Sequence, residues 1–563
     1  MHVSHCSFLA AVALATFPPI AIANGAPDAA PSIAWGPCQE SWVGRASGVL
    51  GERLRCGSLT VPFDHVAPDG REMNIGVIRI RAAKPKQREG AIFFNVGGPG
   101  SHPGKLLRSM GEAWSRVALT DPEEGDKRRL AERFDLIAVI PRGLVGSGDF
   151  HCEVIAAPAP HAFLPTHLGD ENWRLLVNEA QTTVDACTAV PQARYINTEQ
   201  HTHDMDMVRR VLGDERIHFY GISYGGMVGA WYASLYPSHT GRLLLDSSID
   251  LMHGYRAAGH LALDARHRAF NDDVLAPLLR DPARYGLGES ADSVTSALDD
   301  FPSKAREAWS RRLDTPLRLA AALHIGAWVD AEPDLALESM TRRIEHADFS
   351  SDRALNRRIR LEALQLAPAL YHSPISNEIS IAGDAEGDFV RVAMGCNDIP
   401  WLRSDTEIRE SARRYAARYF DFNGDETMEE VTCSRWGGPV ARRPNLEVLG
   451  RAPPFLLIQS EKDTVTPLAG ANHILESFTN AHMLVVRRSR LHGVFNFTTS
   501  ACIERTAARY LLSGAVPAAA SRAFTCDEIF HNPVDSMPGQ PPSPMVEPTP
   551  IDVPVNPTNH QEL

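Results

Sequence analysis

One serine in the chain lies in a setting that suits nucleophilic chemistry. The stretch YGISYGGM places Ser223 between Gly221 and Gly225, which is a G-x-S-x-G pattern. An apolar run, IHFYGI (217–222), precedes the serine, and a helix-like stretch, MVGAWYASLYP, follows it. Glycines on both sides relieve the crowding of a sharp strand-to-helix turn and leave the serine hydroxyl exposed. The pattern therefore predicts that Ser223 is the nucleophile of an acyl-transfer reaction.

A serine hydroxyl is a weak nucleophile at neutral pH, so it needs a base. Where the nucleophile follows a strand in this way, the chain order is serine, then acid, then histidine. His492 comes four residues after the last apolar run, MLVVRR (483–488), and forms a His-Gly pair. We predict that His492 is the base. His482, which lies before that run, is the weaker candidate.

The acid should follow the preceding apolar run, PFLLIQS (454–460). Asp463 does so, and it lies 29 residues before His492, which leaves room for a helix and a strand. Its expected role is to orient the imidazole and to stabilise its charged form. Glu461 and Asp246 are alternatives, and Asp246 ends another apolar run, LLLDS.

A glycine-rich loop, VGGPGSHPGKLL (96–107), resembles a phosphate-binding loop at first sight. Both known patterns fail, however, because Pro99, Pro103 and Leu106 occupy required positions. In a serine hydrolase of this kind, an early loop donates a backbone N–H to the oxyanion, together with the residue after the nucleophile. We predict an oxyanion hole formed by Gly98 (or Gly97) and Tyr224. His102 either lines the entrance to the substrate site or packs within the loop, and we favour the second interpretation.

Short apolar runs alternate with helix-like stretches through most of the chain. Continuous runs such as AIFFNV (91–96) and FDLIAVI (134–140) are typical of parallel strands that are covered on both faces. The stretch THDMDMVRRVLG has helical spacing, with Gly213 as its stop. We therefore predict an α/β fold: a mostly parallel sheet with helices on both faces.

The alternation stops between about 250 and 450, where Arg- and Ala-rich segments such as SDRALNRRIRLEALQLAPALY (351–371) favour helices. We predict a large, mainly helical cap insertion there. The last residues are Pro-rich and polar, which is typical of a tail without its own core. The predicted parts are a signal peptide (1–23), a first core part (24–249), the cap (250–450), a second core part (451–531) and the tail (532–563).

The N-terminus favours export. An apolar run, FLAAVALATF (8–17), and small residues before Asn24 are typical of a signal peptide, although no Lys or Arg precedes the run. Eight cysteines follow, and an even number in an exported chain suggests disulfides. The simplest expectation pairs neighbours: Cys38 with Cys56, Cys152 with Cys187, Cys396 with Cys433, and Cys502 with Cys526.

Composition and motifs argue against several classes of partner. The formal net charge of −13 argues against a nucleic-acid partner, which would favour a basic surface. No later apolar run reaches the length of about 18 residues that a membrane span requires, so we expect no span. No CxxC or Cys/His cluster suggests zinc, and we expect neither a metal nor a cofactor. The sequence leaves the oligomeric state open.

The motifs, in their order, resemble the secreted tripeptidyl aminopeptidase and proline iminopeptidase family of α/β-hydrolases. The matching segments include GGPG, PRGLVGSG, GISYGG and DTVTP, followed by His492-Gly493. The part with Cys502, YLLSGAVP and Cys526 looks like the tripeptidyl-aminopeptidase-like C-terminal region. The resemblance implies the α/β-hydrolase fold and an exopeptidase that removes single residues or short peptides from free N-termini through an acyl-enzyme. It also implies that acidic cap residues bind the α-amine of the peptide substrate.

A carboxylesterase or lipase with the same triad is the alternative, because one fold hosts both activities. An aminopeptidase needs cap carboxylates that face the site, whereas an esterase needs a mainly apolar acyl pocket. A binding protein that kept only the fold is a third possibility, which the intact order of serine, acid and histidine disfavours.

Overall fold

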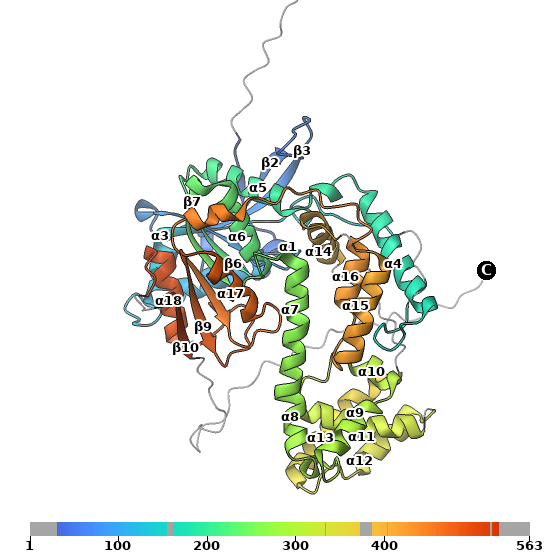
Figure 1. Cartoon of the computed structure of the whole chain (residues 1–563). Coiled ribbons are helices and arrows are strands. Elements are labelled where there is room, and N and C mark those ends of the chain that lie inside the picture. Colours follow the sequence, from blue (N-terminus) through green and yellow to red (C-terminus); the bar gives the residue numbers. More distant parts are fainter. Residues whose placement is uncertain are drawn as a thin grey trace, which may run out of the picture.

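The computed structural model describes residues 31–154, 159, 161–332, 334–371, 385–401, 403–517 and 521–527. The predicted signal peptide (1–23) and the predicted tail (532–563) lie outside these residues. The centre of the molecule is a ten-stranded sheet with the strand order β1-β2-β3-β5-β4-β6-β7-β8-β9-β10 (Figure 1). Its strands are β1 (Ala34–Gly36), β2 (Leu54–Pro62), β3 (Glu72–Ile80), β4 (Gly90–Asn95), β5 (Phe134–Val139), β6 (Ile217–Ile222), β7 (Thr240–Asp246), β8 (Phe455–Ser460), β9 (Ala481–Arg487) and β10 (Ala523–Asp527).

The predicted mostly parallel sheet is confirmed. The pairs from β5–β4 through β9–β10 are parallel, whereas the pairs β1–β2, β2–β3 and β3–β5 are antiparallel. The central strands β5 and β8 are buried at every residue, which is why they are continuous apolar runs. The sequence pattern missed β1, β2 and β10, which lie at or near the two edges of the sheet.

Helices cover the sheet in two groups. One group is α2 (Gly104–Arg116), α3 (Gly125–Arg133) and α18 (Ala501–Ser513), in which α3 contacts the other two. The other contains α5 (Thr198–Leu212) and α6 (Tyr224–Leu235), which also contact each other, while α17 (Leu468–Ser477) packs on β8 and β9. Helix α5 ends where predicted, because Gly213 takes the left-handed conformation, with φ 75°. A short helix, α1 (Glu40–Val43), precedes β2.

Between β7 and β8 the chain forms the helical cap (Figure 1). Helix α7 continues through a π-helical turn into α8 and leads to an outer lobe, and α15 and α16 lie beside α7 on the way back. The cap helices are α7 (Gly254–Ala269), α8 (Ala276–Arg280), α9 (Ala291–Asp299), α10 (Ser303–Trp309), α11 (Pro316–Ala331), α12 (Leu337–His346), α13 (Arg353–Leu366), α14 (Ala385–Asp398), α15 (Asp405–Arg418) and α16 (Asp425–Cys433).

One helix from outside the insertion between β7 and β8 packs against the cap. Helix α4 (Asp170–Thr188) precedes β6, within the predicted first core part, yet its Trp173 shares an apolar cluster with Leu263 of α7, Ile408 of α15 and Val431 of α16. The outer lobe has a separate apolar cluster around Trp309. The cap is thus built from two chain segments and two small cores.

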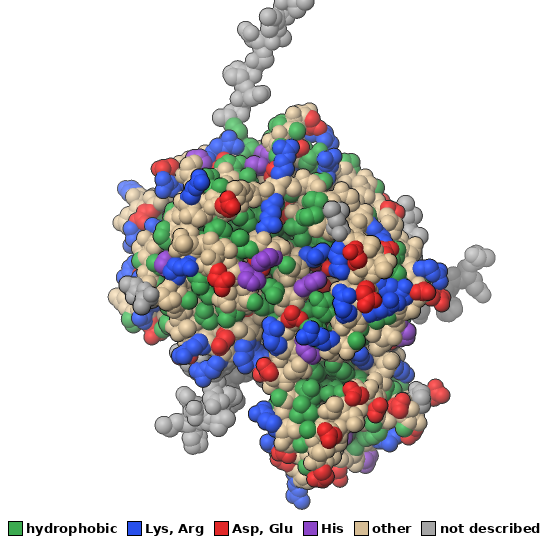
Figure 2. All heavy atoms as spheres, viewed as in Figure 1, with side chains coloured by type: hydrophobic (Ala, Val, Ile, Leu, Met, Phe, Trp, Pro, Cys, Tyr) green, Lys and Arg blue, Asp and Glu red, His purple; other side chains and the backbone are tan. Residues whose placement is uncertain are grey.

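The eight cysteines form four disulfides, each between sequence neighbours: Cys38–Cys56, Cys152–Cys187, Cys396–Cys433 and Cys502–Cys526. The third joins α14 to α16 inside the cap. In the part of the chain that the structure describes, no helix is both long and apolar enough to cross a bilayer. Acidic and basic side chains are intermixed over the face shown in Figure 2.

Candidate active site

Ser223 occupies the sharp turn between β6 and α6. Its φ is 59°, in the left-handed region that few residues other than glycine adopt. A Cβ on Gly221 would lie 2.4 Å from the carbonyl oxygen of Gly225, and a Cβ on Gly225 would lie 2.4 Å from that of Asn95. The two flanking glycines are therefore required by the close approach of the backbone, as the G-x-S-x-G pattern predicts.

Asp463 and His492 lie together at the ends of β8 and β9. The Oδ2 of Asp463 is 3.0 Å from the Nδ1 of His492. The other carboxylate oxygen accepts the backbone N–H groups of Val465 (2.8 Å) and Thr466 (3.0 Å). The Thr466 hydroxyl lies 3.0 Å from Asp463 Oδ2 and 3.2 Å from His492 Nδ1. The carboxylate is thus held in one orientation and presents Oδ2 to the imidazole.

The rival acid, Asp246, has a different place. Its carboxylate is buried and accepts the backbone N–H groups of Val494 (2.9 Å) and Phe495 (2.8 Å), just after His492. Its carbonyl oxygen accepts the N–H of Ser223 at 2.9 Å. Burial raises the pKa of Asp246 to about 7, although these hydrogen bonds oppose the shift. Asp246 therefore anchors both the histidine loop and the serine turn.

Shared contacts bring the histidine loop against the serine turn. The N–H of Gly493 donates to Ser247 Oγ at 2.9 Å, and a Cβ on Gly493 would lie 3.3 Å from the side chain of Ile222. Among the described residues no hydrogen bond joins Ser223 to His492. Such bonds are often long before a substrate binds.

The weaker candidates are separated from Ser223. His482 is the second residue of β9, opposite Leu456 of β8, so it lies near the starts of parallel strands rather than at their carboxyl ends. Glu461 accepts the backbone N–H of Arg488 at 2.6 Å. Neither side chain has a hydrogen bond to the other candidate triad residues in the described part of the chain.

The glycine-rich loop lies directly against the serine turn. A Cβ on Gly97 would lie 3.0 Å from the backbone nitrogen of Tyr224. The N–H of Gly97 donates to the Asn95 side chain at 2.9 Å. Within the described residues, the N–H groups of Gly98 and Tyr224 have no hydrogen-bond partner. These are the two donors that the sequence predicts for an oxyanion, with Gly98 favoured over Gly97 because Gly97 is already engaged.

The side chain of Tyr224 is fixed by a buried cluster that the sequence did not predict. Its hydroxyl donates to Asp398, at the end of cap helix α14, and lies 2.9 Å from the hydroxyl of Thr198. Thr198 also donates to Asp398 at 2.7 Å. Burial raises the pKa of Asp398 to about 6. The cap thereby contacts the residue whose backbone would bind the oxyanion.

His102 fills the loop rather than facing the cavity that contains Ser223. Its Nε2 is 3.3 Å from the Val145 carbonyl oxygen, and its Nδ1 accepts the Gly104 N–H at 3.2 Å. Burial lowers the pKa of His102. These contacts agree with the favoured interpretation of this residue.

A cavity of about 130 Å³ opens next to Ser223, between the core and the cap. Core residues contribute one side, and helices α7 and α16 contribute most of the rest. Its lining comprises Gly98, Ser223, Ile249, Tyr255, Arg256, Ala258, Gly259, His260, Trp401, Glu426, Glu429, Glu430, Val465 and Thr466.

Three glutamates on one face of α16 face this cavity. Glu426, Glu429 and Glu430 are spaced at i, i+3 and i+4, so their side chains lie on the same side of the helix. Glu426 pairs with Arg266, and Glu430 lies 2.6 Å from Arg403 and 3.0 Å from His260.

Glu429 has the least compensated environment of the three. Its carboxylate lies 3.2 Å from Arg391, yet burial raises its pKa to about 7 against that opposing charge. The sequence could not single it out, since the stretch TMEEVTC resembles any polar helix. Its position beside Ser223 depends on the tertiary arrangement of the cap.

Comparisons with known proteins agree with this geometry. Residues 97–333 match the model of the alpha/beta hydrolase fold, and residues 419–525 match that of TAP-like protein. The tripeptidyl aminopeptidase of Streptomyces coelicolor is 25% identical over 510 residues, which cover 88% of this chain and 86% of that protein. Serine protease Hip1 of Mycobacterium tuberculosis is 26% identical over 533 residues, 90% of this chain and 95% of that protein.

A relative with a different activity in its name has a comparable percentage identity. Carboxylesterase B of Mycobacterium tuberculosis is 25% identical over 518 residues, which cover 88% of this chain and 90% of that protein. The peptidase names therefore do not decide the substrate class. The chain is a serine hydrolase with the α/β-hydrolase fold, and its C-terminal part is similar to TAP-like proteins.

Proposed function

We propose that the chain is an exported serine aminopeptidase that cleaves single residues or short peptides from free peptide N-termini. The observation that carries the proposal is the shared cavity: Ser223 lines one side and the three glutamates of α16 line another. A nucleophile for the carbonyl and carboxylates for a cationic amine therefore lie within one small space. The peptidase names of two relatives support the same assignment.

In the proposed reaction, His492 takes the proton of Ser223 as the hydroxyl oxygen attacks the peptide carbonyl carbon. The charge of the imidazolium is stabilised by Asp463, whose Oδ2 already lies 3.0 Å from Nδ1. The N–H groups of Gly98 and Tyr224 bind the oxyanion. His492 then protonates the leaving amine, and water hydrolyses the acyl-enzyme with His492 again as the base.

The substrate's α-ammonium group would bind the carboxylate face of α16, with Glu429 as the main partner. Each of the three glutamates has a cationic partner, but that of Glu429, Arg391 at 3.2 Å, leaves its pKa raised to about 7. A bound ammonium group would favour the ionised form of Glu429. A residue whose nitrogen is acylated or part of a peptide bond lacks this α-ammonium charge, so the same contact would select exopeptidase over endopeptidase substrates.

An esterase is the second candidate. Ile249, Tyr255, Trp401 and Val465 give the cavity an apolar part that would suit an acyl chain, and Carboxylesterase B is a relative of equal identity. Carboxylates in the same cavity disfavour a neutral acyl group, because covering charged groups with an apolar chain removes their hydration and is costly.

The test compares peptide p-nitroanilides of one, two and three residues with their N-acetylated forms. The proposal predicts that acetylation lowers kcat/KM strongly for the preferred length. Equal turnover of blocked and free substrates would favour the esterase. Ser223→Ala is the blank for background hydrolysis.

Export is supported by the four disulfides, because such bonds persist in oxidising compartments and are rare in the cytosol. Fractionation of cells that express the full chain tests it. Protein recovered only from the cytosol with free thiols would contradict export.

A further inference from the structure

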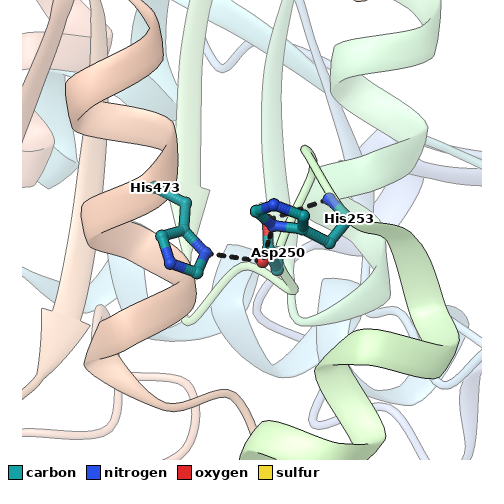
Figure 3. Close-up of side chains that lie close together, drawn as sticks. All are labelled: Asp250, His253 and His473. Carbon is teal, nitrogen blue, oxygen red and sulfur yellow. Dashed lines mark hydrogen bonds and ion pairs between the residues drawn. The ribbon is translucent and has the colours of Figure 1, made fainter.

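A cluster of one carboxylate and two imidazoles lies at the base of the cap, beside the proposed active site. Asp250 follows β7 closely, His253 directly precedes α7, and His473 belongs to α17. Figure 3 shows Asp250 between the two imidazoles, with His473 approaching from the core helix and His253 from the first turn of the cap. The sequence could not reveal this group, because His473 lies 220 residues after His253.

The distances in the cluster suit a metal ion. The Oδ2 of Asp250 is 2.8 Å from the Nδ1 of His253 and 2.8 Å from the Nδ1 of His473. One ligand atom from each residue lies within 4.8 Å of the other two. Around an ion with bonds of about 2.1 Å, adjacent ligand atoms are about 3–3.5 Å apart. Small rotations of the side chains would therefore place all three atoms around one ion.

Backbone hydrogen bonds and close packing fix the orientation of the Asp250 carboxylate. Asp250 is 2% exposed, and its Oδ1 accepts the backbone N–H groups of Met252 (2.9 Å) and His253 (3.3 Å). This leaves Oδ2 for the imidazoles. Helix α17 approaches closely because Gly470 has no side chain: a Cβ there would lie 3.1 Å from that of Asp250. Gly470 is one turn before His473, so this contact places the imidazole over the carboxylate.

We propose that Asp250, His253 and His473 bind one divalent transition-metal ion of the zinc class. Imidazole nitrogen with a carboxylate oxygen is a donor set that suits zinc, and three protein ligands leave one position for water. The side chains of His253 and His473 are 57% and 37% exposed, so an ion can enter from solvent. On binding, each Nδ1 would exchange its hydrogen bond to Asp250 for a bond to the ion, and the ring proton would reside on Nε2.

The ion would tie the cap to the core. His253 lies at the start of α7, whose Tyr255 and Arg256 line the cavity, whereas His473 lies on α17 of the core. An ion that binds only this folded arrangement stabilises it by mass action. The proposal does not depend on the peptidase assignment, because its test reads metal binding rather than turnover.

The experiment uses the full chain without an affinity tag, freed of metal by a chelator, and titrated with ZnCl2 by calorimetry. We expect one equivalent to bind and to raise Tm. We expect His473→Ala and His253→Ala each to weaken binding at least tenfold. His267→Ala is the matched control, because His267 also pairs with a carboxylate, that of Asp421 at 3.1 Å, but outside this cluster.

Co²⁺ supplies a second readout, since its visible absorption reports nitrogen and oxygen ligands directly and should be lost in His473→Ala. No zinc binding by the wild-type chain would overturn the proposal. So would affinity that is unchanged in both cluster variants while their Tm without metal matches the wild type. A variant that fails to fold is replaced by His473→Gln, which keeps the size of the side chain.

Discussion

The carboxyl ends of the strands and the inner face of the cap use carboxylates in opposite ways. After the carboxyl end of β8, Asp463 accepts two backbone N–H groups and lies 3.0 Å from a single imidazole nitrogen. On α16, Glu429 is half-buried with one arginine at 3.2 Å, and its pKa is raised to about 7. The first environment fixes a charge for chemistry. The second leaves the charge of a carboxylate poorly compensated, so that a cationic ligand can neutralise it.

This contrast separates catalysis from recognition. The proposed catalytic groups all lie in turns that follow strands, where short chain segments and backbone hydrogen bonds hold them. The proposed recognition groups lie on a helix that is held by packing against other helices and by the Cys396–Cys433 disulfide. Changes in the two regions should therefore have different kinetic signatures.

The largest expected effect comes from the nucleophile. Ser223→Ala removes the attacking oxygen and should lower kcat by about 10⁶-fold, with Tm unchanged. The measurement is the release of p-nitroaniline from a free tripeptide anilide. Ser234→Ala, on the same helix α6, is the control and should keep its activity, since its hydroxyl bonds only to the Ala230 carbonyl oxygen at 2.9 Å. Substantial turnover by Ser223→Ala would remove the basis of the mechanism.

The next largest effect distinguishes the two candidate acids, Asp463 and Asp246. Asp463→Asn should lower kcat by about 10⁴-fold, because an amide cannot stabilise the imidazolium in the same way. Asp246→Asn should change kcat far less but should lower the free energy of unfolding by about 1–3 kcal/mol, through weaker acceptance of the Val494 and Phe495 N–H groups. Steady-state kinetics and urea denaturation of both variants give the comparison. The reverse pattern would make Asp246 the catalytic acid.

On the cap, Glu429→Gln should act on binding rather than on chemistry. Loss of one charge-assisted contact costs about 1.5–3 kcal/mol, so kcat/KM should fall by about 10- to 100-fold, mainly through KM. Glu410→Gln, an exposed glutamate of α15, is the matched control and should leave both constants unchanged. A fall confined to kcat would place Glu429 in the catalytic step instead.

The smallest expected effect is a pH dependence of KM. As the pH falls through about 7, Glu429 gains a proton and loses its attraction for the substrate ammonium group, so KM should rise. Above about 8 the substrate amine loses its own proton, and KM should rise again. Glu429→Gln should abolish the acidic limb. A KM profile that is identical in the variant would assign this limb to another group.

Local sequence patterns point to the proposed catalytic groups but not to the proposed recognition groups. Ser223 and His492 each follow an apolar run in a recognisable local pattern, and Asp463 also follows such a run. Sequence order favours Asp463 as the acid but leaves Asp246 as an alternative, because both follow strands; the contact of Asp463 with His492 at 3.0 Å supports the first. Asp398, Glu429 and His473 have no local signal, since each acquires its neighbours only through the packing of distant helices.

Likewise, the apolar pattern predicted the buried strands β4 to β9 but not β1, β2 and β10. A strand that is buried on both faces is a continuous apolar run, whereas β10 is only partly buried and resembles a loop. The cap was predicted as helical, but the contribution of α4 depends on contacts of Trp173 that only the structure reveals.

One measurement tests the division between catalysis and recognition most directly: the ratio of kcat/KM for a free tripeptide anilide to that for its N-acetylated form, in the wild type and in Glu429→Gln. We predict a large ratio in the wild type that falls by at least tenfold in the variant, while turnover of the acetylated form changes little. A wild-type ratio near one, or a ratio that Glu429→Gln leaves intact, would contradict the proposal that this face of the cap recognises the peptide N-terminus.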